Sequence, residues 1–219
     1  GAVKNSYGFV YGFHKAKGHT QYPSADSFAR MLIDLNKCVA PKLYVMDGIV
    51  AMEGNGPGSG DPVPMNVLLM STDPVALDSV FSRLVYLKPE MVPTNYHGEK
   101  MGLGTWKEEE ITLLTPDGEI SMAEAVKKYG NPAFNVDRTE VRKNIWTRMA
   151  GALNIFQKKP YIEADKCVRC GICVQSCPVP GKAVDFRKGK GKPPVYDYRK
   201  CIRCFCCQEM CPKKAIKVK

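Results

Sequence analysis

The hydrophobic positions of residues 1–157 follow two periods, one typical of helices and one typical of strands. In residues 24–39, apolar side chains from Phe28 to Leu35 recur every three or four positions behind Ser24, which is a suitable N-cap. This spacing predicts an amphipathic helix. The same signals predict further helices at residues 73–87, 121–129 and 137–158.

Short apolar runs between these helices predict strands. They lie at residues 7–13, 43–50, 66–70 and 111–114. Residues 53–64 are rich in glycine and proline and predict a loop between the second and the third run. Because strands separated by helices indicate layers of both, we expect an α/β layered domain here. With a separate cysteine-rich module at its C-terminal end, the whole chain is predicted to be α+β.

Cysteines set the pattern of the C-terminal part. The chain has ten cysteines, and nine of them lie between Cys167 and Cys211. Two runs share the spacing Cys-x2-Cys-x2-Cys-x3-Cys-Pro, at residues 167–178 and 201–212. Ten cysteines in a small secreted protein would indicate disulfides, whereas this spacing is typical of metal ligands.

Each run can supply three ligands to one iron–sulfur cubane, because three cysteines separated by two residues fit one tight loop. The fourth cysteine begins a stretch that points away, and it therefore serves the other cluster. We predict a first 4Fe–4S cluster bound by Cys167, Cys170, Cys173 and Cys211. We predict a second 4Fe–4S cluster bound by Cys177, Cys201, Cys204 and Cys207.

The two runs resemble the bacterial two-cluster ferredoxin, and the resemblance covers residues 158–219. It implies a small ferredoxin-like module there, so we expect one domain at residues 1–157 and another at 158–219. Two features depart from the family's pattern. The segment after the first run is two residues longer than the one after the second, and a basic loop, residues 187–194, separates the runs. Cys206 is an extra cysteine, which could replace a neighbouring ligand or pack beside the cluster.

Two alternatives for the cysteines stay open. Pairs of Cys-x2-Cys could hold tetrahedral zinc, although a three-plus-one run repeated twice fits cubanes better. The clusters could also serve only to stabilise a small domain that buries little core. Two adjacent clusters exceed what stability requires and give an electron an entry and an exit, so electron transfer is favoured.

The charge balance suggests the kind of partner. Residues 158–219 carry 16 Lys and Arg against 5 Asp and Glu, whereas the preceding residues carry 16 against 17. Because complementary charge speeds encounter, we expect an acidic redox partner such as a flavodoxin or another ferredoxin. A basic tail also suggests a regulatory or nucleic-acid-binding iron–sulfur protein. That class is less favoured, since few aromatic residues are interleaved with these charges, such as Tyr196, Tyr198 and Phe205.

The sequence also bears on location. No apolar run approaches the ~18–20 residues that cross a bilayer, so we expect no membrane span. Thiolates that hold iron are lost to oxidation, and a reducing, anaerobic cytoplasm is therefore the expected setting. The chain begins at Gly1 and shows no signal-peptide pattern, and we expect the natural protein to begin further upstream.

Four segments of the first domain share the motifs of a second family. They are His14-Lys15-x3-His19, residues 46–57 (MDGIVAMEGNGP), residues 71–78 (STDPVALD) and Gly102-Leu103-Gly104. In this order they resemble the family known as domain of unknown function 362, which is often joined to a ferredoxin module. The resemblance covers residues 7–114 and implies no established reaction. Because members of that family begin further upstream, we expect this chain to hold only the later part of the domain.

Acidic side chains in these segments are candidate site residues of the first domain. Asp47 and Glu53 flank the end of a predicted strand, where α/β sheets usually bind ligands. Asp73 and Asp78 lie at the next strand–helix junction. These carboxylates could hold a divalent cation or act as general acid and base. In the structural alternative, Asp73 is an N-cap ahead of Pro74 and Asp78 is a solvated helix residue.

Two further candidates precede them. His14 and Lys15 could bind a ligand or contact a substrate, although histidines near a strand end are more often surface residues. The glycines of residues 54–60 do not favour a phosphate-binding loop, because prolines and a strand follow them instead of a helix with a lysine.

The function that the sequence favours is an iron–sulfur electron carrier fused to a substrate- or partner-binding domain. Its clusters would relay single electrons between a redox partner and the N-terminal domain or another protein. The alternative is a redox enzyme, or an oxidoreductase component, with a carboxylate, metal or small-molecule site in the first domain. The sequence leaves open whether the chain is an enzyme, and it identifies no small-molecule substrate.

Overall fold

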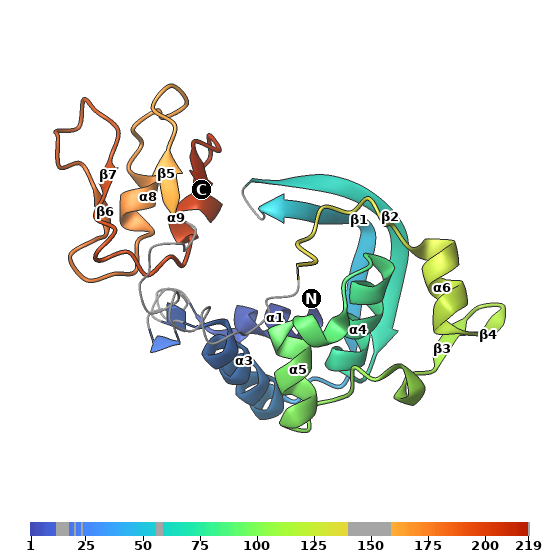
Figure 1. Ribbon diagram of the computed structural model, residues 1–219. Coiled ribbons are helices and arrows are strands. Elements are labelled where there is room, and N and C mark those ends of the chain that lie inside the picture. The colour runs from blue at the N-terminus through green and yellow to red at the C-terminus, as the bar shows by residue number, and fades with distance from the viewer. Residues whose placement is uncertain (12–17, 20, 23, 56–58, 140–158, 219) are drawn as a thin grey trace. The chain divides into compact units, whose positions relative to one another are not determined.

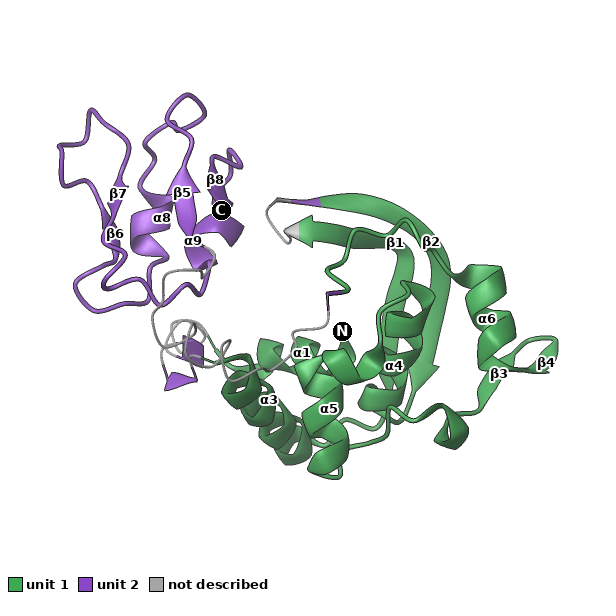
Figure 2. Cartoon of the chain, in the orientation of Figure 1, with its two compact units in different colours: residues 1–15, 24–54, 61–138 green, residues 16–23, 55–60, 139–219 purple. Residues whose placement is uncertain are grey.

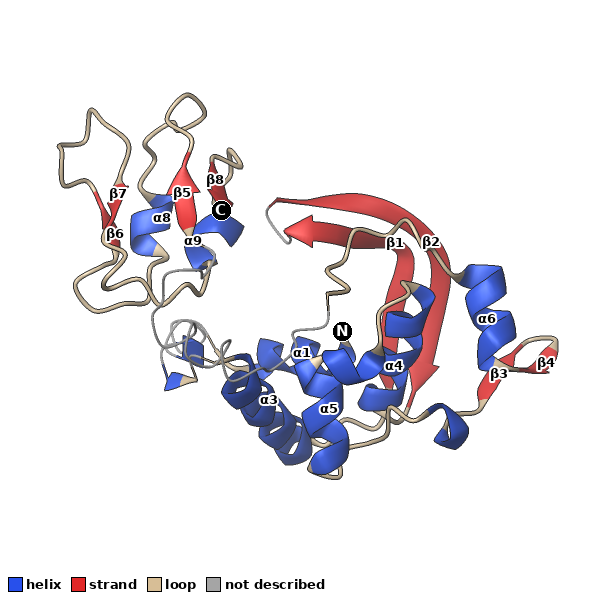
Figure 3. Ribbon diagram, in the orientation of Figure 1, coloured by secondary structure: helices blue, strands red, loops and turns tan. Residues whose placement is uncertain are grey.

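The computed structural model describes residues 1–11, 18–19, 21–22, 24–55, 59–139 and 159–218 (Figure 1). The chain forms two compact units (Figure 2). The N-terminal unit comprises residues 1–15, 24–54 and 61–138, and the C-terminal unit comprises residues 16–23, 55–60 and 139–219. The predicted domain boundary, between residues 157 and 158, lies outside the described residues. Helices and strands in small separate sheets make the fold α+β, as predicted (Figure 3).

Helices make up much of the N-terminal unit. The longer ones are α3 (Ala25–Val39), α4 (Pro74–Leu84), α5 (Pro93–Lys100) and α6 (Met122–Tyr129). The short ones are α1 (Ala2–Asn5) and the 3-10 turns η1 (Ser6–Phe9), η2 (Pro89–Met91) and η3 (Glu108–Glu110). Ser24 and Ser121 each begin a capping box, in which the hydroxyl accepts from the backbone N–H three residues on. The helices predicted at residues 24–39, 73–87 and 121–129 are confirmed.

The strands β1 (Tyr44–Asn55) and β2 (Ser59–Ser71) form a two-stranded ribbon, which curves with α4 lying along it (Figure 1). A short hairpin, β3 (Leu113–Thr115) with β4 (Gly118–Ile120), is antiparallel. The predicted loop is wrong at residues 53–55 and 59–64, because β1 continues to Asn55 and β2 starts at Ser59, and residues 56–58 lie outside the described residues. A two-stranded ribbon makes each strand an edge strand, and edge strands tolerate proline. Nor is β1 a buried strand, since Val45 and Ile49 are exposed.

Helix α4 is the centre of the unit's packing. At its C-terminal end, Leu84 joins a cluster with Met65, Val67, Val85 and Phe134. At its N-terminal end, Val75 joins a second cluster with Val3, Leu32 and Ile33. These two clusters hold the ribbon and α3 to the same helix.

Two predictions at the margins of this unit differ from the structure. Residues 7–13 do not begin a strand, because Ser6–Phe9 form the turn η1. The Tyr7 ring packs edge-on against Phe28 with centroids 5.1 Å apart, so the aromatic pattern reflects packing on α3. Of the helix predicted at residues 137–158, residues 137–139 are not helical, and the remainder lies outside the described residues.

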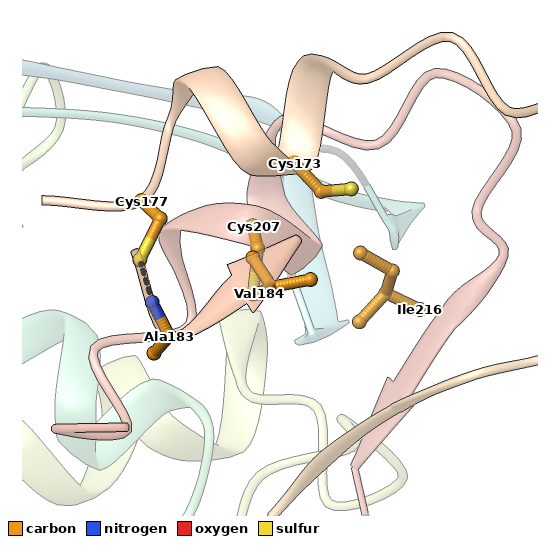
Figure 4. Packing of buried hydrophobic residues seen from close by; sticks show 6 residues of the cluster. All are labelled: Cys173, Cys177, Ala183, Val184, Cys207 and Ile216. Carbon is orange, nitrogen blue, oxygen red and sulfur yellow. Dashed lines mark hydrogen bonds between the residues drawn. The ribbon is translucent and has the colours of Figure 1, made fainter. Parts of the chain in front are cut away.

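The C-terminal unit consists of two similar halves. Strand β5 (Pro160–Ile162) pairs antiparallel with β8 (Ile216–Val218), and β6 (Val184–Asp185) pairs antiparallel with β7 (Val195–Tyr196). Each half carries one turn of helix, α8 (Ile172–Gln175) in the first and α9 (Cys206–Glu209) in the second. The halves share one small core, formed by Cys173, Cys177, Ala183, Val184, Cys207 and Ile216 (Figure 4).

Candidate iron–sulfur centre

Two cavities of the C-terminal unit are each lined by four cysteines. The first holds about 370 Å³ of empty space, partly open to solvent, and its cysteines are Cys167, Cys170, Cys173 and Cys211. The second holds about 300 Å³, and its cysteines are Cys177, Cys201, Cys204 and Cys207. Each cavity therefore gathers three cysteines of one run with the fourth cysteine of the other run.

Left-handed backbone turns bring the cysteines of each run together. Arg169 and Arg203 occupy equivalent positions and have φ angles of 60° and 57°. Two residues later, Gly171 has φ 79° and Phe205 has φ 58°, and a one-turn helix follows each. A left-handed residue turns the backbone sharply, so the cysteines, which are every third residue of the loop, can face one space.

The fourth cysteine of each run accepts a backbone hydrogen bond at its sulfur. The Ala183 N–H donates to Cys177 Sγ over 3.3 Å, and the Ala215 N–H donates to Cys211 Sγ over 3.4 Å. Figure 4 shows the first of these. The donor is six residues after Cys177 but four after Cys211, so the longer segment after the first run preserves this contact.

Burial raises the pKa values of two cysteine thiols. It raises the pKa of Cys173 to about 11 and the pKa of Cys207 to about 12. Metal ligands must be deprotonated, so a strongly bound cation is required to hold these sulfurs as thiolates. Apolar walls, among them Ile162, Ile172 and Ile216 in the first cavity, limit the access of water to the donors. A soft donor set made only of cysteine sulfurs, in a mostly apolar pocket, fits an iron–sulfur cluster.

Cys206 is the extra cysteine of the second run. It occupies the position equivalent to Ile172, at the start of α9, and it is not among the residues that line the second cavity. Its sulfur donates to the Cys204 carbonyl over 3.9 Å. Its thiol also hydrogen-bonds the Cys204 sulfur, which lowers the pKa of Cys204 to about 7 and raises the pKa of Cys206.

Tyr196 contacts a cysteine of the second set. From the sequence it was noted only as one of a few aromatic residues among basic ones. Its hydroxyl donates to Cys207 Sγ over 3.2 Å. Tyr196 stands five residues before the first cysteine of its run, and the residue in that place in the first half is Ile162. Comparing the two halves position by position could have revealed this difference.

The acidic candidates of the N-terminal unit lie in separate places. Asp47 is exposed and accepts from the Ile49 N–H over 3.0 Å, while Glu53 accepts from the Asn135 N–H over 2.7 Å. Six residues of strand separate these two carboxylates by ~20 Å. Among the described residues, no group of three or more His, Cys, Asp or Glu side chains could hold a single metal ion. His14 and Lys15 lie outside the described residues.

Asp73 and Asp78 both bind backbone N–H groups. Asp73 caps α4, accepting from Val75 N–H at 2.7 Å and Ala76 N–H at 2.9 Å, and its other oxygen accepts from Thr105 N–H at 2.9 Å. The N-cap alternative for Asp73 is therefore confirmed.

Asp78 is 7% exposed and accepts from the N–H groups of Ala2 and Val3, so it is not a solvated helix residue. Burial raises the pKa of its carboxyl.

The glycine motif of residues 102–104 also has a structural role. A Cβ atom on Gly104 would lie 1.9 Å from Asp73 Oδ1, so only glycine permits this carboxylate to reach Thr105. Gly48 is similar, since a Cβ there would lie 2.8 Å from Val67. These shared motifs thus preserve close packing around the start of α4 and along the ribbon.

An apolar cavity lies in the N-terminal unit beside Asp78. Its volume is about 420 Å³, and it is partly open to solvent. Its wall is mostly apolar, with Phe28, Leu32 and Phe81 among its residues, and Lys4 and Asp78 provide charge. This cavity is a concave site of the size that small ligands use.

The fold and the paired cysteine cavities define a ferredoxin-type iron–sulfur module joined to an α+β domain. Comparison with known proteins agrees on both parts. Residues 159–212 match the family described as 4Fe-4S dicluster domain, and residues 1–83 match the family described as Domain of unknown function (DUF362). The C-terminal unit is thus a 4Fe–4S-binding module of the kind that transfers electrons.

One relative shares a substantial segment with the chain. The Thylakoid-associated protein sll1697 of Synechocystis sp. is 42% identical over 102 residues, which are 46% of this chain and 32% of the relative. The chain thus spans about a third of the relative's length. No solved structure matches the chain. None of the helices in the described part of the chain has both the length and the apolar character needed to cross a membrane.

Proposed function

We propose that this chain is an electron-transfer protein with two 4Fe–4S clusters. Cys167, Cys170, Cys173 and Cys211 hold the first cluster, and Cys177, Cys201, Cys204 and Cys207 hold the second. The observation that carries the proposal is the lining of the two cavities, each of which combines three cysteines of one run with the fourth of the other. Zinc in place of the clusters is disfavoured, because no group of three or more His, Cys, Asp or Glu side chains among the described residues could hold a single metal ion.

Each cluster, when bound, supplies one-electron redox chemistry at a potential that its surroundings set. The chain's own residues provide these surroundings. The cysteine sulfurs bind the cluster, the apolar walls limit the access of water, and the N–H groups of Ala183 and Ala215 donate to sulfur. Hydrogen bonds to sulfur and low solvent exposure are two of the factors that tune such centres.

The electrons pass between a redox partner and either the N-terminal unit or another protein. The partner is an acidic protein of the flavodoxin or ferredoxin type, because the C-terminal residues carry a large excess of Lys and Arg. The setting is a reducing cytoplasm, in which the thiolates survive. If charge steers the encounter, the rate of oxidation by such a partner falls as salt rises.

Anaerobic iron and sulfide analysis with a reduced-state EPR spectrum tests the cluster content. We expect about eight iron per chain and the broad signal of two coupled clusters. The variant C211A should lower the iron content, whereas C38A, which changes an exposed cysteine of α3, should not. Zinc in place of iron, or equal loss of iron in both variants, would contradict the proposal.

The apolar cavity of the N-terminal unit favours a second candidate function, a redox enzyme that uses the electrons on a bound small molecule. The cavity combines apolar walls with the charged side chains of Lys4 and Asp78. Native mass spectrometry of the purified full chain would reveal a bound compound, and A29W, which fills the wall of the cavity, should abolish that binding. Equal binding in the two proteins would exclude this site.

A further inference from the structure

A groove on the C-terminal unit combines tyrosine rings with lysine side chains. It encloses about 750 Å³ of empty space and is open to solvent. Three tyrosines and two lysines line it, namely Tyr161, Tyr196, Tyr198, Lys188 and Lys192. The lysines come from the basic loop between the two cysteine runs, for which the cluster ligands alone give no role.

The groove shares walls with both cysteine cavities. Tyr196 lines the groove and also the second cavity, where its hydroxyl donates to Cys207 Sγ over 3.2 Å. Ile162 and Pro194 line the groove and also the first cavity. A molecule in the groove would therefore be separated from each cysteine set by a single layer of side chains.

The aromatic wall is held in place before any partner arrives. The rings of Tyr196 and Tyr198 stack with centroids 5.6 Å apart and an interplanar angle of 13°. The Tyr198 hydroxyl donates to the Pro160 carbonyl over 2.9 Å. Rigid tyrosines provide contact area at little cost in conformational entropy, which suits a docking surface.

The charge of the groove is positive and unneutralised. Lys188 and Lys192 are exposed, and neither forms an ion pair with another described residue. The nearby arginines differ, because Arg187 and Arg199 both pair with Asp197, at 3.5 Å and 3.3 Å. The two lysines are thus available to carboxylates of a partner.

We propose that this groove is the docking surface for an acidic one-electron redox protein, and that electrons cross at the Tyr196 wall beside the second cysteine set. This inference rests on the proposed function and adds the place of contact. One electron passes between the chain and the partner, so one is oxidised as the other is reduced, and no bond forms or breaks. Tyr196 links the groove to a cysteine of the second set, because its hydroxyl donates a hydrogen bond to the Cys207 sulfur.

A protein partner fits the groove better than a single-stranded nucleic acid. Nucleic-acid grooves place successive aromatic faces where bases can stack, along a track of phosphate-binding charges. Here Tyr196 and Tyr198 stack on each other, so their facing surfaces are not open to bases. The two lysines make a small patch, which matches a cluster of carboxylates.

Charge reversal in the groove tests the proposal. The cluster-loaded full chain and the variant K188E/K192E are reduced anaerobically and mixed in stopped flow with a purified bacterial flavodoxin that has an acidic surface. The control K190E/K200E makes the same change in charge at exposed lysines of the same unit that do not line the groove. A small neutral quinone serves as an oxidant that needs no docking surface.

At low ionic strength, we expect K188E/K192E to lower the bimolecular rate with flavodoxin by about tenfold or more, and K190E/K200E to lower it less. The difference between the variants should disappear at high salt, and the quinone should oxidise all three proteins equally. Equal rates for the two variants at low salt would overturn the groove as the docking surface.

Two other outcomes separate this inference from its alternatives. In the first, a labelled single-stranded oligonucleotide binds the chain, K188E/K192E alone loses that binding, and the rate of this variant with flavodoxin is unchanged. The groove is then a nucleic-acid site, and the proposal fails. If the loaded chain gives no electrons even to the quinone, the proposed electron-transfer function fails, and the groove proposal fails with it.

Discussion

The Tyr196 hydroxyl donates a hydrogen bond to the Cys207 sulfur over 3.2 Å. The equivalent residue of the first half, Ile162, has no donor to offer the matching sulfur. The two cysteine sets, which have identical spacing, therefore differ in this hydrogen bond. Because hydrogen bonds to ligand sulfur influence the potential of a cluster, the two clusters should not be equivalent.

Removing this hydroxyl should lower one reduction potential. In Y196F, the reduced cluster loses a hydrogen-bond donor to sulfur. A hydrogen bond of net ~1 kcal/mol corresponds to a shift of some tens of millivolts in the reduction potential, because ~59 mV corresponds to a tenfold change in the equilibrium constant of a one-electron couple. A redox titration followed by EPR should show one potential becoming more negative and the other unchanged. The matched variant Y198F removes a hydroxyl bonded to a carbonyl and should shift neither. Equal shifts in both variants would show that the sulfur contact is not the cause.

Cys206 should be dispensable for binding iron. Its sulfur donates a hydrogen bond to the Cys204 carbonyl, and Cys206 does not line the second cavity, whereas the adjacent Cys207 does. We expect C206A to retain the full iron and sulfide content, measured anaerobically on the purified chain, and C207A to lose iron. A large loss in C206A would show that it replaces a neighbour as a ligand.

Asp73 should matter for stability more than Asp47 does. D73A removes the cap of α4 and leaves the Thr105 N–H without its partner, which should lower the free energy of unfolding by ~1–2 kcal/mol. D47A removes one local contact of an exposed residue and should change the free energy of unfolding by less than ~0.5 kcal/mol. Denaturant unfolding of the N-terminal unit, followed by circular dichroism, gives both values. Equal losses would contradict the capping role.

Asp78 should give the N-terminal unit a pH dependence. Burial raises the pKa of its carboxyl above 3.8, so the folded state binds a proton more tightly than the unfolded state. The contribution of this group to stability is therefore full below the unfolded pKa and is lost as pH rises through the raised folded pKa. Thermal unfolding, measured from a pH below the unfolded pKa to a pH above the folded pKa, should show this loss of stability in the native chain and a smaller loss in D78N. An unchanged profile in D78N would assign the dependence to other groups.

Much of the C-terminal module could be predicted from the sequence because its determinants are local. Three cysteines separated by two residues need only one tight loop to face a common space, and the run is repeated. Helix starts were predictable for the same reason, since Ser24, Asp73 and Ser121 bond N–H groups two or three residues on.

Only the tertiary structure decided the features that depend on distant partners. Asp78 was a candidate acid until α1 placed the N–H groups of Ala2 and Val3 against it. Pro62 and Pro64 indicated a loop, yet both lie within β2, and a strand of a two-stranded ribbon is an edge strand, which tolerates proline.

The cysteine spacing by itself thus determined which four cysteines line each cavity. The pairing of β6 with β7 and the stacking of Tyr196 on Tyr198 determined how the two sets differ and where a groove reaches them. The physical reason is that ligand spacing acts within one turn of chain, whereas a hydroxyl 11 residues from its sulfur is positioned only by the folded strands around it.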